Sequence, residues 1–122
     1  MDADWVRNYF KTVDTLDADA IAANFANDGK FRFSNQPPAE GKQAVRDSLA
    51  QFFETIQAMH HENTGLWLGD DGNSAVWEAD VTYTRKNGTQ VILPCASILR
   101  SRNDKIYDFR MNMDISPVYD SK

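Results

Sequence analysis

Two adjacent histidines, His60 and His61, are the side chains of this sequence best suited to proton transfer near neutral pH. They stand at the start of a segment of strand-like composition. Because successive side chains of a strand point to opposite faces of the sheet, at most one of the two can face the interior of the domain. The same geometry prevents the pair from chelating one metal ion from a regular strand, so we expect no metal site.

The single cysteine, Cys95, lies in the segment Leu93-Pro94-Cys95-Ala96 and has no basic neighbour that would lower its pKa. We therefore predict a buried, unreactive thiol rather than a nucleophile. The sequence also contains no phosphate-binding loop, dinucleotide-binding glycine motif, nucleophile-elbow serine or zinc-ligand spacing. It predicts no cofactor.

Aromatic and methionine side chains recur at positions that could surround an apolar pocket. Methionine adapts its shape readily to apolar ligands. The predicted ligand-binding residues are Phe31, Phe33, Phe53, Met59, Trp67, Trp77, Met111 and Met113. The alternative, that these side chains simply form the core, stays open at this stage.

Three segments with apolar residues every three or four positions predict helices. The first begins with Asp4 as its cap, and the second begins at Asp17 and ends at Asn27-Asp28-Gly29. The third follows Gly41 and extends to Met59. Their apolar stripes are Val6, Phe10 and Val13; Ile21 and Phe25; and Val45, Leu49, Phe52, Phe53, Ile56 and Met59.

Strand-like segments make up most of the remainder, with Asn87-Gly88 as the strongest hairpin signal. The predicted strands are residues 30–34, 60–68, 76–85, 89–100 and 105–114. Helices followed by an antiparallel meander indicate an α+β fold, which we expect to form one domain over residues 1–122. A short meander must curl over its helices to bury Trp67 and Trp77, and its concave face can enclose a pocket.

Alternation along two of these strands predicts which side chains face the helices. On strand 76–85 the apolar set is Trp77, Ala79, Val81 and Tyr83, and on strand 105–114 it is Tyr107, Phe109, Met111 and Met113. Burying each large apolar side chain contributes roughly 1.5–3 kcal/mol, so we expect these sets to face inward. Glu78 and Asp80 then face solvent or a partner subunit.

The bulk composition excludes several classes of partner. The net charge is −5 and the basic residues are scattered, which disfavours nucleic acids and anionic membranes. No apolar run approaches the ~20 residues that span a bilayer. Residues 1–5 lack the features of a signal peptide and Cys95 is the only cysteine, so we expect a cytoplasmic protein.

The order helix, helix, strand, long helix and meander resembles the nuclear transport factor 2-like superfamily and, within it, the SnoaL-like group. The segments that carry the resemblance are Leu16-Asp17-Ala18-Asp19-Ala20-Ile21, Phe25-Ala26-Asn27-Asp28-Gly29, Gly41-Lys42-Gln43-Ala44-Val45 and residues 105–114. The resemblance implies a cone-like fold, with three N-terminal helices packed on a curved antiparallel sheet that encloses an apolar pocket. It also implies a homodimer formed through the sheet. Because the superfamily contains both enzymes and transport factors, the fold implies no single reaction.

Ketosteroid isomerases and scytalone dehydratases offer two comparisons. Tyr9 stands at the tyrosine donor position of the isomerases, but their base and second donor positions hold Phe33 and Ala96, which excludes that chemistry. In scytalone dehydratases, His60 falls near one histidine position and Asp14 near the aspartate position. On this resemblance we take His60 as the inward histidine.

Limonene epoxide hydrolases and SnoaL-like cyclases are two further enzyme groups of the superfamily with which these residues can be compared. Asn35 matches the hydrolase asparagine, and Asp80 and Asp114 fall at its aspartate positions, but Glu78 replaces its arginine. Cyclases use an aspartate on the last strand beside a histidine, a role that Asp114 and His60 would fill.

Two functions therefore stay open. The chain either binds a small hydrophobic molecule without chemistry, or it is a cofactor-independent cyclase, isomerase, dehydratase or hydrolase. In the second case Asp114 is the acid/base, and His60, Asn35 and Tyr9 orient substrate or water.

Overall fold

The computed structural model describes residues 1–119 of the 122-residue chain. Three helices, α1 (Ala3–Val13), α2 (Ala18–Ala22) and α3 (Lys42–Phe53), pack on a six-stranded sheet. The strands are β1 (Phe25–Phe33), β2 (Ala39–Glu40), β3 (Ile56–Leu68), β4 (Ser74–Arg85), β5 (Gln90–Arg102) and β6 (Lys105–Asn112). A short 3-10 helix, η1 (Ser116–Tyr119), follows β6. The architecture is α+β, as the sequence predicts.

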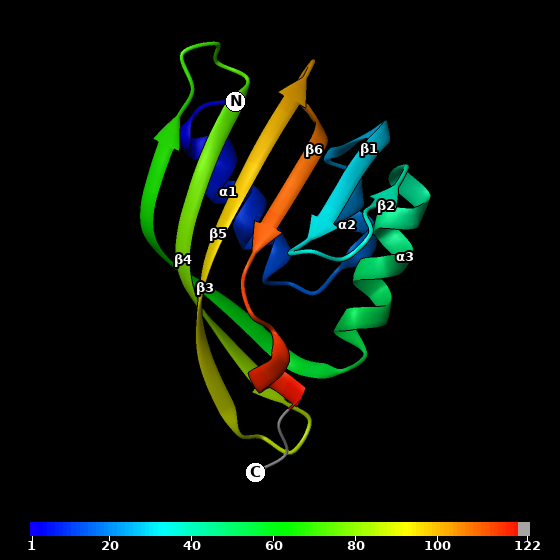
Figure 1. Cartoon of the computed structure of the whole chain (residues 1–122), viewed down its shortest axis with the longest axis vertical. Coiled ribbons are helices and arrows are strands. Elements are labelled where there is room, and N and C mark those ends of the chain that lie inside the picture. The colour runs from blue at the N-terminus through cyan, green and yellow to red at the C-terminus, as the bar shows by residue number, and fades with distance from the viewer. Residues whose placement is uncertain (120–122) are drawn as a thin grey trace.

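The sheet has the strand order β2-β1-β6-β5-β4-β3. Neighbouring strands are antiparallel except β1 and β6, which run parallel, so the sheet is mostly rather than wholly antiparallel. Figure 1 shows the strong curvature of the sheet and places α3 beside the edge formed by β1 and β2. In the described residues, no helix is long and apolar enough to cross a membrane.

Carboxylates cap the first two helices. The side chain of Asp2, not Asp4, accepts the N–H of Trp5 at 2.8 Å and begins α1. Asp17 accepts the N–H of Ala20 at 3.0 Å, which confirms the predicted start of α2. Each bond satisfies an N–H group that has no partner within the helix.

The second helix is shorter than predicted, because Phe25 belongs to β1 and pairs with Ile106 of β6. The segment Asn27-Asp28-Gly29 does not end a helix but lies within β1, where the register with β6 shifts between Phe25 and Lys30. Gly29 is required there, because a Cβ at this position would lie only 2.9 Å from the carbonyl oxygen of Ile106. The four-residue spacing of Ile21 and Phe25 predicts a helix, but the parallel pairing of β1 with β6 places Phe25 in a strand instead.

The third helix also ends early, at Phe53 rather than Met59. The N–H and hydroxyl of Thr55 both donate to the carbonyl of Phe52, at 2.9 and 2.6 Å, and close the last turn. Ile56 and Met59 belong to β3, and the register with β4 is irregular between Ile56 and Ala58. A strand irregularity here imitates the three-residue spacing of a helix.

The predicted orientation is confirmed for β4 and, on β6, for Phe109 and Met111, whereas Tyr107 is half-buried beside the fully buried Ile106. Trp77, Ala79, Val81 and Tyr83 are buried, whereas Glu78 and Asp80 are exposed. On β6, Phe109 and Met111 are buried and Arg110 is exposed. The inner face of the sheet therefore carries the apolar set on these two strands.

Candidate functional site

An apolar cavity of about 330 Å³ lies between α3 and the helix-covered face of the sheet. Its walls come from the end of α1, from α3, β1, β2, β3, β4 and β6, and from the segments before β2 and after β6. The lining residues are Val13, Phe31, Phe33, Gln36, Pro37, Pro38, Ala39, Ser48, Leu49, Phe52, Phe53, Met59, Tyr83, Met111, Ile115 and Tyr119. Pockets for small molecules usually measure about 300–1,000 Å³, so this cavity suits a ligand of one or two rings.

Stacked aromatic rings fill the interior beside α1. Phe10 stacks on Trp77 with ring centroids 4.3 Å apart, and Phe31 stacks on Phe109 at 5.1 Å. The cavity remains where α3 faces Met59 and Tyr83, beyond the reach of the α1 rings. The interior is therefore packed solid at one end and hollow at the other.

Five of the eight predicted ligand-binding residues line this cavity: Phe31, Phe33, Phe53, Met59 and Met111. The other three do not. Trp67 is 56% exposed and lies on the outer face of the sheet, so the predicted burial of Trp67 is wrong. Trp77 is in the core, and Met113 is half-buried outside the lining, where its sulfur accepts a hydrogen bond from the hydroxyl of Tyr83.

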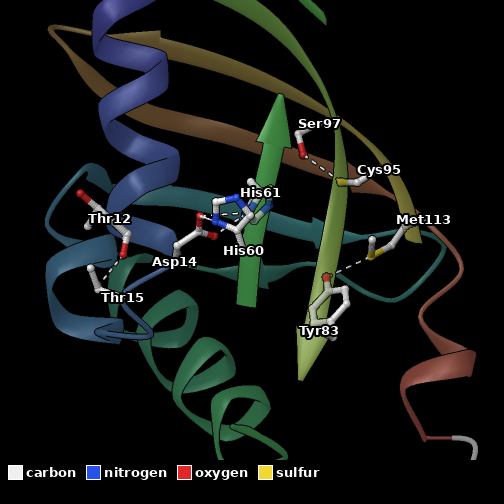
Figure 2. Close-up of polar contacts among 9 residues, drawn as sticks. All are labelled: Thr12, Asp14, Thr15, His60, His61, Tyr83, Cys95, Ser97 and Met113. Carbon is white, nitrogen blue, oxygen red and sulfur yellow. Dashed lines mark hydrogen bonds and ion pairs between the residues drawn. The ribbon is translucent and has the colours of Figure 1, made fainter. Parts of the chain in front are cut away.

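Tyr83 is the only buried residue with a hydrogen-bonding side chain in the described lining. Gln36, Ser48 and Tyr119 are exposed at its rim, whereas Tyr83 is 1% exposed. The Tyr83 hydroxyl donates to the Met113 sulfur at 3.3 Å (Figure 2). Burial raises the pKa of Tyr83 above its ordinary value, because the phenolate would lose its hydration.

A carboxylate–histidine pair lies between α1 and β3. Figure 2 shows Asp14, at the end of α1, directed toward both histidines. His61 Nδ1 lies 2.6 Å from Asp14 Oδ1, and the backbone N–H of His61 donates to Oδ2 at 3.0 Å. His60 Nδ1 is more distant, at 3.7 Å. A carboxylate only accepts, so the Nδ1 atom of His61 carries the proton in this bond.

The inward histidine is His61, and the expectation that His60 faces inward is wrong. The His61 side chain is 2% exposed and its Nε2 is buried with no hydrogen-bond partner in the described structure, whereas the His60 side chain is 74% exposed. Neither histidine belongs to the cavity lining. The pair thus joins α1 to β3 beside the cavity rather than inside it.

The remaining predicted catalytic residues also lie outside the lining. Tyr9 is buried among rings, stacked on Trp5 with centroids 5.8 Å apart, and burial raises its pKa. Asn35 is exposed. Asp114 is exposed as well, and its carboxylate accepts the backbone N–H of Ser116 at 3.0 Å, which lowers the pKa of Asp114. The structure therefore does not gather the four predicted catalytic residues around the cavity.

Cys95 is buried with its sulfur 3.6 Å from the hydroxyl of Ser97, and burial raises the pKa of the thiol. Within residues 1–119, no three side chains of His, Cys, Asp or Glu converge where a metal ion could bind. The groups capable of chemistry at the cavity are thus the buried phenol of Tyr83, the exposed phenol of Tyr119 at the rim and, outside the lining, the Asp14–His61 pair.

The sequence analysis did not predict Tyr83 as a site residue, although the alternation on β4 places it on the inner face of the sheet. Tyr83 is the only member of the inward apolar set of β4 with a hydroxyl. The contact between Asp14 and His61 had no such signal, because the two residues are 47 positions apart and meet only through the packing of α1 on β3.

Three solved structures illustrate the fold relatives of this chain. A hypothetical protein of Catenulispora acidiphila with a ketosteroid isomerase-like fold, crystallised with trimethylamine, has 20% identity and a TM-score of 0.84 over 97% of this chain and 91% of its own. The epoxide hydrolase/cyclase-like enzyme SalBIII, which has a role in pyran ring formation in the polyether salinomycin, has 22% identity and a TM-score of 0.79 over 93% of this chain and 90% of its own. An NTF2-like protein of unknown function from Burkholderia pseudomallei has 16% identity and a TM-score of 0.81 over 93% and 91%.

Identities this low establish the shared fold and nothing about ligand or reaction. No curated protein matches the chain. A family model does match: residues 6–109 fit the SnoaL-like domain. Since this match covers most of the sequence and agrees with the α+β architecture, the chain belongs to the SnoaL-like domain family.

Proposed function

We propose that this chain binds a small apolar molecule in the cavity between α3 and the sheet. The observation that carries the proposal is the lining, in which apolar side chains surround about 330 Å³ and the polar ones, Tyr83 apart, stand at the rim. Protein interiors are normally packed as densely as organic crystals, and an empty apolar space forfeits the dispersion contacts of its walls. A ligand restores these contacts, and burying its surface provides the main driving force.

The placement of the acidic residues favours binding over turnover. The alternative function, a cofactor-independent cyclase, isomerase, dehydratase or hydrolase with Asp114 as acid/base, needs a proton-transferring group within hydrogen-bond reach of the substrate. Asp114 is exposed and lies outside the cavity lining. The enzyme hypothesis would therefore require Asp114 to move inward when substrate binds.

The binding proposal is tested with an apolar fluorescent probe, N-phenylnaphthylamine, and a variant that fills the cavity. Ala39 lines the cavity from β2, so Ala39→Trp places an indole in the space that the probe would occupy. We expect this variant to weaken probe binding by about tenfold or more, because two ring systems cannot share the volume. Ala58→Trp, the same substitution at an exposed position of β3, is the matched control and should leave the affinity unchanged.

Equal probe affinity in the wild type and in Ala39→Trp would refute binding at this cavity. Native mass spectrometry of freshly purified protein is the complementary measurement. It would detect a retained apolar ligand as an added mass that Ala39→Trp loses and Ala58→Trp keeps.

The second part of the proposal is a homodimer formed through the outer face of the sheet. Trp67, Val76 and Ile92 are exposed there, with Ile92 65% exposed. The β3–β4 side of this face carries Glu62, Glu78 and Asp80. The β5–β6 side carries Arg100 and Arg110, which share Asp108 as their ion-pair partner and leave that side with a net positive charge. A two-fold axis parallel to the strands would set the β3–β4 side of one copy against the β5–β6 side of the other and bring unlike charges together. A Trp67→Lys variant should shift the mass measured by light scattering from dimer to monomer, and a monomeric wild type would refute the dimer.

A further inference from the structure

We propose that the Tyr83 hydroxyl is the polar anchor of the cavity and that it selects a neutral ring compound carrying a carbonyl oxygen. This inference rests on the proposed binding function. It goes further by naming the chemical class of the ligand and the single protein atom that recognises it.

The first support is the burial of Tyr83 at the cavity wall. Tyr83 comes from β4 at the wall of the cavity and is 1% exposed. The other hydrogen-bonding side chains of the described lining, Gln36, Ser48 and Tyr119, are exposed and reach water. Tyr83 is therefore the buried donor of the cavity wall. Its hydroxyl is directed at Met113, which lies outside the lining, so a ligand oxygen reaches it by taking the place of the Met113 sulfur. A hydrogen bond to such an unsolvated donor discriminates most strongly.

The second support is the weakness of the present acceptor. The hydroxyl donates to the thioether sulfur of Met113 at 3.3 Å, which is its one side-chain hydrogen bond among the described residues. A thioether is a weak acceptor, whereas a carbonyl oxygen is a strong one. Met113 is half-buried and unbranched, so it can turn aside at little cost when a better acceptor arrives.

The charge of the lining decides between a carbonyl compound and an acid. The described lining contains no Lys, Arg or His. A carboxylate ligand would therefore bury a negative charge without a cation, which is strongly unfavourable. Burial raises the pKa of Tyr83, so its hydroxyl stays a donor at neutral pH. The site thus suits a ketone, quinone, ester or lactone on an apolar ring system.

The test compares two bicyclic probes that differ by one oxygen, tetralin and its ketone α-tetralone. Their affinities are measured by displacement of N-phenylnaphthylamine from the wild type and from Tyr83→Phe, which removes only the hydroxyl. The preference for the ketone should fall by about three- to tenfold in Tyr83→Phe, the range expected for one net hydrogen bond. The affinity for tetralin should stay within about twofold, because it makes no such bond.

Two further variants make the result specific. Tyr9→Phe removes the hydroxyl of another buried tyrosine that does not line the cavity, so it should keep the wild-type preference. Met113→Leu removes the competing acceptor and leaves the Tyr83 hydroxyl free, so it should increase the preference for the ketone.

The possible outcomes distinguish the role of the Tyr83 hydroxyl from ligand binding in the cavity. If tetralin and α-tetralone both displace the probe but their ratio is unchanged in Tyr83→Phe, the anchor is refuted while the binding function stands. If the carboxylic acid of tetralin binds more tightly than the ketone, the neutral-ligand assignment is wrong. If neither bicyclic compound displaces a probe that does bind, the assignment to this ligand class is refuted. If the probe itself fails to bind, the proposed function falls as well.

Discussion

Replacing Asp14 with alanine should lower the free energy of unfolding by about 3 kcal/mol, a value that follows from the hydrogen bonds and the charge of this residue. Asp14 accepts two hydrogen bonds from His61, one from the ring at 2.6 Å and one from the backbone at 3.0 Å. Hydrogen bonds to a charged group contribute about 1.5–3 kcal/mol each. The alanine variant leaves both donors of His61 without a partner, at a side chain that is 2% exposed.

Two effects act in the opposite direction and set the net value. The Asp14 side chain is 20% exposed, so water screens part of its interaction. Asp14 also caps the C-terminal end of α1, where a negative charge faces the negative end of the helix dipole and costs about 0.3–1 kcal/mol. Alanine relieves this cost. Subtracting both from two charged hydrogen bonds gives about 3 kcal/mol, or a fall in Tm of about 10 °C for a domain of this size.

Urea unfolding followed by tryptophan fluorescence measures the change in the free energy of unfolding. Asp14→Asn is the informative companion, because its amide oxygen can still accept one bond without the charge, and it should lose about half as much. Glu54→Ala, at the exposed acidic residue that caps the C-terminal end of α3, should stay within about 0.5 kcal/mol of wild type. A loss below about 1 kcal/mol for Asp14→Ala would refute the reasoning, since it would mean that the two bonds contribute little in solution.

The remaining predictions concern tyrosine, glycine and cysteine. Burial raises the pKa of Tyr9 and Tyr83 in the folded protein, so the two tyrosines should add no pH dependence to stability below about pH 10. Above it, stability should fall by about 1.4 kcal/mol per pH unit for each, with a shallower fall in Tyr83→Phe, as denaturant midpoints at increasing pH would show. Gly29→Ala should cost about 1–3 kcal/mol in urea unfolding, because its Cβ would press on the Ile106 carbonyl between β1 and β6. Cys95 should react with a thiol reagent only after unfolding, at a rate that rises with denaturant, because the thiol is buried and burial raises its pKa.

Much of the fold follows from patterns that local physics enforces. The alternation on β4 and β6 predicts their inner faces because a sheet with helices on one side must bury one set of side chains. The Asn87-Gly88 hairpin forms as predicted, with Gly88 at a φ of 88°. The cap at Asp17 also forms, because its carboxylate satisfies a free N–H of the first turn.

The cavity depends on the distances between packed elements, which no local sequence pattern predicts. Whether the space between α3 and the sheet is filled depends on how far the rings of α1 extend. Phe10 packs against Trp77, His61 and Phe109, none of which lines the cavity. The sequence names the apolar residues but not the distance between the elements that carry them. Five of the predicted ligand-binding residues therefore line the cavity, whereas Trp77 packs against Phe10 beside it.

Two expectations for β3 are wrong: His60 as the inward histidine, which came from the family resemblance, and a buried Trp67, which came from the expected curling of the sheet. Both concern a strand that changes parity twice. Regular alternation from the buried Ile56 would place His60 inside, but the irregularity before Ala58 shifts the inward set to Met59 and His61. Regular alternation from His61 would then place Trp67 inside.

A second irregularity, between Asn63 and Gly65, shifts the inward set again, to Leu66, and leaves Trp67 opposite Val76 on the outer face. A one-residue slip reverses every side chain that follows it. Because of the first shift, His61 faces inward and contacts Asp14. Because of the second, Trp67 is exposed on the outer face, where we propose that the dimer forms. Both features arise from where β3 departs from regular geometry, which is why alternation read along the sequence could not find them.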